Sequence, residues 1–227
     1  GASTFNARCD YFSTETIPNH ATMFTGRPTL QPQGFPNTVH HGYLMNAPNP
    51  NDTFHNSGNP QVPYKASFFD VAHDHGLKTA LYASKTRLSI CDQSYNETHG
   101  ALDLIAPDYG RDKIDLAVIN DGPLLSAVIE PLLQDLNSPA PSHYSFIHLR
   151  EPDTTGHNLN WGSGAYSNMV RTIDQELGRI MAAINQNSAL LNRTFLIVSA
   201  DHGGGGESPN QHGDPGHVSN YTIPFFL

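Results

Sequence analysis

An aspartate–histidine pair, Asp201 and His202, stands where an apolar run ends and four consecutive glycines begin. If the run 194–198 is a strand, the pair lies at its carboxyl end, where ligands gather in α/β sheets. Carboxylate and imidazole are also the ligands that zinc takes besides thiolate. An aspartate that caps a turn beside a surface histidine would give the same letters. The pair alone therefore leaves both interpretations open.

Two further segments favour the metal interpretation. Asp153 and His157 lie four residues apart after a second strand-like run, residues 144–149. A further histidine, His212 or His217, follows in a stretch rich in Gly, Ser, Pro and Asn. Two strand ends that each carry an aspartate and a histidine, together with a spare histidine, predict a two-metal site.

A nucleophile for such a site is offered by Thr16. Pro18 suits the first turn of a helix and Gly26 suits its end, so the pattern predicts a helix over residues 18–25. Thr16 then lies at the helix N-terminus, where free N–H groups and the helix dipole favour an anion. A plain N-cap role for the threonine is the alternative.

Taken in this order, four short segments resemble the alkaline phosphatase superfamily. They are Thr-Ile-Pro-Asn-His at 16–20, Asp-Thr-Thr-Gly-His at 153–157, Asp-His-Gly at 201–203 and the final histidine. The branch they resemble most is the type I phosphodiesterase/nucleotide pyrophosphatase family, and the resemblance extends from about residue 4 to residue 226. It implies an α/β fold with a mostly parallel sheet and helices on both faces, in one catalytic domain over residues 1–227.

The resemblance also implies a site with two zinc ions. One zinc would take Asp153, His157 and His212, and the other would take Asp201, His202 and the oxygen of Thr16. His212 is preferred to His217 because a His-x-Asp pattern before a Tyr-x-Ile-Pro-Phe strand fits the family better. Thr16 would be the nucleophile that becomes phosphorylated, and Asn46 would donate to a phosphoryl oxygen.

The chain departs from the family pattern near its start. The family takes a further metal-binding aspartate from a first strand well ahead of the nucleophile, and no such strand is expected here. Asp10 lies too near Thr16 and follows no apolar run. We therefore expect a fragment in which an N-terminal strand and a C-terminal part are missing, with one ligand of the Thr16-side zinc absent.

The implied activity is hydrolysis of a small phosphate ester such as a nucleotide, with a phosphodiesterase or nucleotide pyrophosphatase as the main prediction. A phosphomonoesterase, a phosphonoacetate hydrolase, a sulfatase-like enzyme and an inactive binding relative are the alternatives. A sulfatase uses a modified cysteine in a Cys-x-Pro-x-Arg segment. This chain has Thr16 at the cysteine position and His20 at the arginine position.

Composition limits the partners. The net charge is −9, from 12 Lys+Arg against 21 Asp+Glu, which argues against a nucleic-acid groove. No apolar stretch approaches the length of a membrane span.

Cys9 and Cys91, the only cysteines, could pair in an oxidising compartment or both stay reduced. Four Asn-x-Thr segments add to the expectation of an extracytoplasmic or secreted protein. Lys85 follows a strand-like run and could reach a substrate phosphate, but we expect it to be a solvated strand-end lysine.

The remaining elements follow from periodicity and turn residues. Residues 27–63 are rich in Pro, Asn and Gly and predict a long loop. The pattern predicts helices over 64–75, 124–136 and 166–185, and strands over 78–83, 144–149 and 194–199. The last two strands, joined through the third helix, predict a parallel βαβ pair. The apolar stripe of that helix is expected to be core: Met169, Val170, Ile173, Leu177, Ile180, Met181 and Ile184.

Overall fold

A parallel three-stranded sheet lies at the centre of the structure, a computed structural model that describes residues 1–227. The middle strand β2 (Thr79–Ala83) is buried along its whole length. It pairs in parallel with β3 (Leu116–Ile119) on one side and β4 (Tyr144–His148) on the other. A strand covered on both faces needs an apolar run rather than alternation, which suits the sequence Thr-Ala-Leu-Tyr-Ala.

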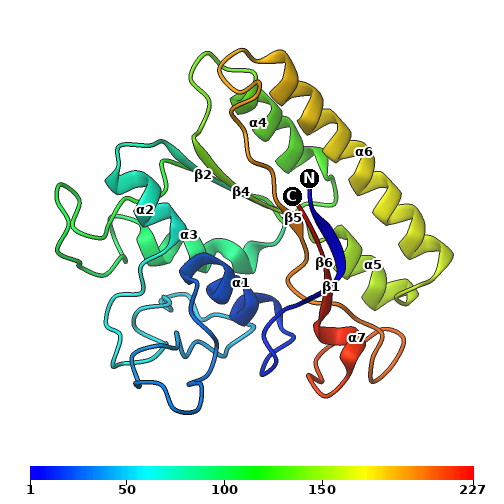
Figure 1. The fold of residues 1–227 in the computed structure, drawn as a ribbon, viewed down its shortest axis with the longest axis horizontal. Coiled ribbons are helices and arrows are strands. Elements are labelled where there is room, and N and C mark those ends of the chain that lie inside the picture. Colours follow the sequence, from blue (N-terminus) through cyan, green and yellow to red (C-terminus); the bar gives the residue numbers. More distant parts are fainter.

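Helices cover both faces of this sheet (Figure 1). Ala80 and Tyr82 pack against α4 (Ser126–Leu136) and α6 (Gly164–Gln186). Leu81 and Ala83 point to the opposite face, because side chains alternate along a strand. There they join a core made largely by α1 (Thr16–Thr25), α2 (Phe68–Asp74) and α3 (Ser89–Tyr95). The expected α/β fold with helices on both faces is confirmed.

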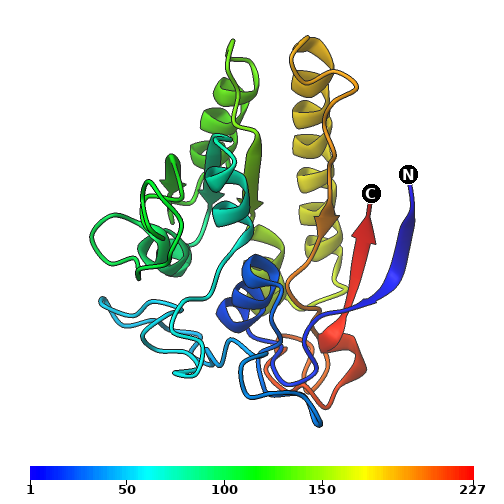
Figure 2. The ribbon, with the colours of Figure 1, turned by 60° about the vertical axis from the view of Figure 1, so that its left-hand side comes forward.

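A second, antiparallel sheet stands beside the first (Figure 2). Its order is β1 (Ser3–Arg8), β6 (Thr222–Phe226) and β5 (Val198–Ser199). The predicted parallel pairing of residues 144–149 with 194–199 is wrong, because β4 pairs only with β2 and β5 only with β6. Residues 194–197 form no ladder, so just two residues of the apolar run pair with a neighbouring strand. The polar N-terminal segment forms a strand all the same, through pairing with β6.

Helix α6 differs from the sequence-based expectation in what it buries. In α6 only part of the apolar stripe is core: Ile180 is buried and Leu177 and Ile184 pack against the cluster on α4. The expectation was wrong for Val170 and Met181, which are exposed, while Met169 and Ile173 are half-buried.

The start of α2 is set by a capping box. The Ser67 side chain accepts from the N–H of Asp70, whose carboxylate accepts from the N–H of Ser67. The helix therefore begins at Phe68 instead of residue 64.

The other elements are short. They are η1 (Thr86–Leu88), α5 (Glu151–Leu159) and α7 (Val218–Tyr221). Residues 27–67 contain no helix or strand, in agreement with the predicted long loop. Cys9 and Cys91 are both free thiols, which agrees with the alternative in which both cysteines stay reduced.

Buried polar side chains hold the long loop in place. The Lys65 ammonium is fully buried and donates to the carbonyls of His55, Asn59 and Val62 at 3.2, 3.0 and 2.7 Å. These bonds satisfy backbone acceptors that no helix or sheet pairs. Burial lowers the pKa of Lys65 to about 8.

Candidate active site

The N-terminus of α1 presents the candidate nucleophile. Thr16 is the first residue of the helix and is buried. The N-cap Glu15 makes no capping bond with its side chain. Asn46 satisfies the helix end from a distance, because its Oδ1 accepts from the N–H of Ile17 at 3.1 Å and its Nδ2 donates to the Glu15 carboxylate. The amide that was expected to meet a phosphoryl oxygen thus lies beside Thr16, with one of its two N–H groups already in use.

Three of the candidate metal ligands have their imidazole rings fixed in the same way. Nδ1 of His157, His202 and His212 lies 2.9, 2.8 and 2.7 Å from the backbone carbonyls of Asn210, Gly203 and Thr14. A carbonyl oxygen only accepts, so each Nδ1 carries the hydrogen and Nε2 is left as the ring atom that can bind a metal. This is the arrangement in which proteins hold metal-binding histidines.

The Asp153 set converges at metal-ligand spacing. His157 Nε2 lies 3.3 Å from Asp153 Oδ1, His212 Nε2 lies 3.5 Å from the same oxygen, and the two Nε2 atoms are 3.2 Å apart. A tetrahedral zinc with bonds of about 2.1 Å places its ligand atoms about 3.4 Å from one another. Asp153 Oδ1 is buried and has no hydrogen-bond partner. These donors fit a zinc ion.

The second pair adjoins the first set. His202 Nε2 is 3.5 Å from Asp201 Oδ2 and is likewise buried without a hydrogen-bond partner. The rings of His202 and His212 stack at 3.7 Å, and donor atoms of Asp153, His202 and His212 all lie within 4.8 Å of one another. The structure therefore brings Asp153, His202 and His212 together, with Asp201 beside His202.

Lys85 joins the nucleophile to the Asp153 carboxylate, although the sequence suggested a solvated side chain. Its ammonium donates to Thr16 Oγ1 at 3.2 Å and to Asp153 Oδ2 at 3.0 Å, and only 15% of its side chain is exposed. The signal that could have identified it is its position just past the end of β2, the same signal that singled out Asp201.

Two histidines behind the site, the buried His20 and the half-buried His148, also escaped the sequence analysis. His20 Nδ1 donates to the Thr16 carbonyl at 2.6 Å and lies 3.6 Å from Asp201 Oδ2. His148 ends β4, and its ring lies 5.0 Å from that of His20. Burial lowers the pKa of His20, and lowers the pKa of His148 to about 3. Both rings adjoin the carboxylate of Asp201.

The carboxylates of the site are held ionised. Burial acts to raise the pKa of Asp201, but His202, His20 and His148 together with Lys85 lower it further than burial raises it. The pKa of Asp153 is also lowered, because Lys85 and His202 outweigh its burial. A site that keeps two anions ready in a buried position suits cations.

Three other features lie apart from this site. His217 contacts Asp214 on the surface. Asp10 uses both oxygens to accept from the N–H groups of Phe12 and Thr29. A cluster with His73, Asp74 and Asp108 already holds the buried ammonium of Lys113 between its carboxylates.

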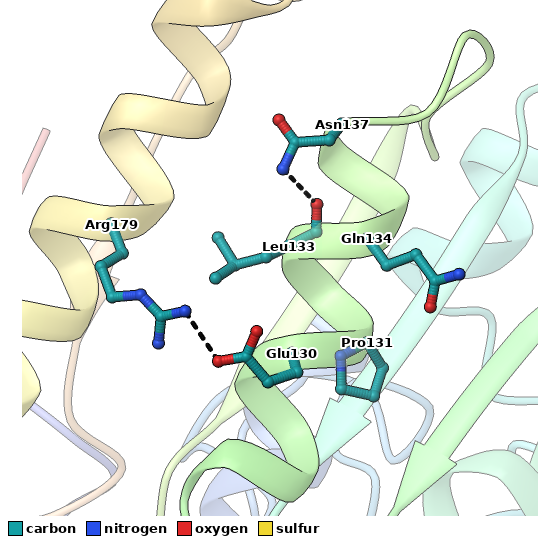
Figure 3. Close-up of a pocket in the computed structure, with 6 residues that line it drawn as sticks. All are labelled: Glu130, Pro131, Leu133, Gln134, Asn137 and Arg179. Carbon is teal, nitrogen blue, oxygen red and sulfur yellow. Dashed lines mark hydrogen bonds and ion pairs between the residues drawn. The ribbon is translucent and has the colours of Figure 1, made fainter.

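A groove of about 560 Å³ lies beside α4, and no histidine lines it. Its lining residues are drawn in Figure 3. Its one cation, Arg179, is paired with Glu130 and Glu176 at 2.7 and 2.8 Å. It therefore has no unpaired charge for a ligand.

Solved structures share this fold. Murine ectonucleotide pyrophosphatase/phosphodiesterase 5, in an inactive threonine-to-alanine form in complex with AMP, matches with a TM-score of 0.53 at 18% identity. The match covers 88% of this chain and 47% of that one. A 2-O GAG sulfatase matches with a TM-score of 0.52 at 10% identity, over 100% of this chain and 56% of its own. The fold is alkaline-phosphatase-like.

Sequence comparison identifies the family that the chain matches and several of its relatives. The family described as type I phosphodiesterase / nucleotide pyrophosphatase matches residues 6–220. Human ectonucleotide pyrophosphatase/phosphodiesterase family member 5 is 23% identical over 195 residues, which is 85% of this chain and 36% of that protein. Rat family member 3 is 29% identical over 203 residues, 85% of this chain and 20% of that protein. The venom phosphodiesterase of Naja atra is 34% identical over 86 residues, 37% of this chain and 10% of its own length.

The chain belongs to the type I phosphodiesterase / nucleotide pyrophosphatase family. It spans about a third or less of the length of these curated relatives. None of its helices is both long and apolar enough to cross a bilayer.

Proposed function

We propose that residues 1–227 form one catalytic domain that hydrolyses phosphoric esters, with a phosphodiester or nucleotide pyrophosphate as its main substrate. Thr16 is the nucleophile and two zinc ions are the cofactors. The observation that carries the proposal is the set of three imidazoles whose Nδ1 hydrogens are fixed on backbone carbonyls, so that their Nε2 atoms face two ionised carboxylates.

The chain's own residues account for the covalent step. Thr16 Oγ1 attacks phosphorus, the Oγ1–P bond forms, and the bond from phosphorus to the leaving oxygen breaks. Water then cleaves the Oγ1–P bond and restores the hydroxyl, so that each turnover consumes one water. Lys85, 3.2 Å from Oγ1, favours the deprotonated hydroxyl and meets negative charge that develops on the phosphoryl oxygens. The N-terminus of α1 favours the same charge through its dipole.

The two zinc ions would be held by Asp153, His157 and His212 and by Asp201, His202 and Thr16. When bound, they supply Lewis-acid stabilisation of the attacking and leaving oxygens. Asn46 contributes the remaining hydrogen of its Nδ2 to a phosphoryl oxygen, and its bond to Glu15 fixes the plane of the amide.

A nucleotide is the substrate that the comparisons favour, since the murine relative binds AMP. Because the net charge of the chain is −9, the protein as a whole does not attract a phosphate, and the groups of the site must bind it. We place the protein outside the cytoplasm, as the names of the ectonucleotidase relatives suggest.

A phosphomonoesterase is a second candidate, and Lys85 is the reason. A monoester carries one more negative charge than a diester, and an ammonium beside the nucleophile favours the more highly charged group. Turnover of chromogenic phosphate mono- and diesters by the zinc-loaded chain decides between the two. A higher kcat/KM for the diester supports the main proposal.

The role of Thr16 is tested by two variants. Thr16→Ala is expected to lose turnover by about 10⁴-fold or more, because the nucleophile is absent. Thr16→Ser keeps a hydroxyl and is expected to retain measurable activity. Mass spectrometry of acid-quenched reactions is expected to detect a phosphorylated chain for the wild type and none for Thr16→Ala. Undiminished turnover by Thr16→Ala would remove this residue from its role.

A further inference from the structure

The single tryptophan of the chain contacts two of the histidines that face the metal site. The Trp161 ring lies 5.0 Å from the ring of His157 and 5.6 Å from that of His212, nearly edge-on to both, at 82° and 71°. These histidines come from α5 and from the loop before α7, so the indole packs against two separate elements. Its own backbone N–H donates to the carbonyl of Pro209 in that loop at 2.8 Å.

Two glycines are needed beside this indole. A Cβ on Gly156, within α5, would lie 2.4 Å from the ring, and one on Gly204 would lie 2.2 Å from it. Neither glycine has a positive φ, so close packing and not backbone conformation accounts for the missing side chains. Gly156 stands between Asp153 and His157, and Gly204 follows His202 by two residues. The indole therefore fills the space between both segments that carry the candidate ligands.

The two histidines need such support because metal binding requires their Nε2 atoms to stay close together. Both Nδ1 hydrogens point to backbone carbonyls, and the two Nε2 atoms are 3.2 Å apart. Each ring is oriented by one Nδ1 hydrogen bond, and the His212 ring also stacks on that of His202, so the other side of each ring must be closed against rotation by a further contact. Contact with a rigid aromatic ring on both restricts that rotation.

We infer that Trp161 is a positioning residue that holds His157 and His212 at metal-binding distance and thereby raises the affinity of the site for zinc. The inference rests on the proposed function, since it assigns these histidines to a metal. Trp161 also reports on the site, because an indole in contact with two imidazoles changes its fluorescence when those imidazoles bind a cation.

The first test needs no variant. Zinc added to the chelator-treated chain is expected to change the tryptophan emission saturably, in step with zinc bound in equilibrium dialysis. Calcium, which prefers oxygen ligands, is the control and is expected to leave the emission unchanged. Zinc that binds with no change in emission would overturn the inference. A wild-type chain that binds no zinc would overturn both the inference and the proposed function.

The second test measures zinc affinity by competition with a chromogenic chelator. Trp161→Ala is expected to weaken zinc binding by about 10- to 100-fold, the usual effect of removing a group that orients a ligand. Trp161→Phe keeps an aromatic edge and is expected to recover most of the affinity. Equal affinity in Trp161→Ala and the wild type would overturn the inference alone.

A steric control separates positioning from general stability. Gly204→Ala is expected to weaken zinc binding in the wild-type chain, where its methyl group meets the indole, and to have little further effect in the Trp161→Ala chain. Thermal unfolding in chelator shows that each variant is folded. Additive losses in the double variant would contradict the assigned contact.

Discussion

Acidification from pH 7 to pH 5 is expected to destabilise the chain through two buried histidines of the long loop. His41 Nδ1 accepts from the N–H of Tyr43 at 3.0 Å, and His55 Nδ1 accepts from the N–H of Lys65 at 3.0 Å. A protonated ring would place a hydrogen against each of these N–H groups. Burial, chiefly, lowers the pKa of both histidines to about 4.

The sign follows from proton binding. Between the unfolded pKa of about 6.5 and the folded pKa of about 4, the unfolded chain binds more protons than the folded chain. The stability that each imidazole contributes is therefore present above pH 6.5 and is lost as the pH falls toward 4. From pH 7 to pH 5 the loss is about 2 kcal/mol for each ring, or about 4 kcal/mol for the pair.

Urea unfolding in the presence of a chelator, at pH 7 and at pH 5, measures this loss. His41→Asn is the matched variant, because its amide oxygen can accept from the Tyr43 N–H and does not titrate. Its loss of unfolding free energy between the two pH values is expected to be smaller than that of the wild type by about 2 kcal/mol. The same loss in both chains would refute the assignment of a neutral, bonded His41.

Three further outcomes follow from the contacts described. Lys85→Met is expected to lower kcat/KM by roughly 10²-fold, and by more for a monoester than for a diester, as measured by steady-state kinetics with both substrates. An equal loss for both substrates would argue against contact between Lys85 and the second negative charge of the monoester. Ser67→Ala, which breaks the capping box, is expected to lower the free energy of unfolding by about 1 kcal/mol in urea, with Ser138→Ala, whose hydroxyl bonds to nothing, as the control. Zinc at about 100 times its dissociation constant is expected to raise the free energy of unfolding by about 2.7 kcal/mol, and His217→Asn is expected to leave that gain intact.

The nucleophile helix and the central strand could be predicted from sequence because local chemistry fixes them. Pro18 and Gly26 mark the helix, Gly26 with a φ of 64° at its end, and the continuous apolar run at 79–83 marks a buried parallel strand. The partner of the 194–199 run could not be predicted. An apolar run shows that a strand needs cover but does not identify its neighbour, and β6 lies more than twenty residues further on.

The candidate site was predictable only in the residues whose types suggest metal binding. Asp153, His157 and His212 stand out by type and spacing, and the structure brings them together. Lys85 and Trp161 were not identified as part of it, because a lysine after a strand and a tryptophan after a helix are common at surfaces. Their contacts arise from the path of the chain between β2, α5 and the loop before α7.

The residues of the site follow strands of two different sheets, and no strand of one sheet is hydrogen-bonded to a strand of the other. Lys85 and Asp153 follow strands of the parallel sheet, whereas Asp201 and His202 follow β5 of the antiparallel sheet. No backbone hydrogen bond between β4 and β5 fixes the distance between the residues that follow the parallel sheet and those that follow the antiparallel sheet. A cation shared by Asp153 and His212 would therefore act as a cross-link between them, so that occupancy of the site and rigidity of the molecule rise and fall together.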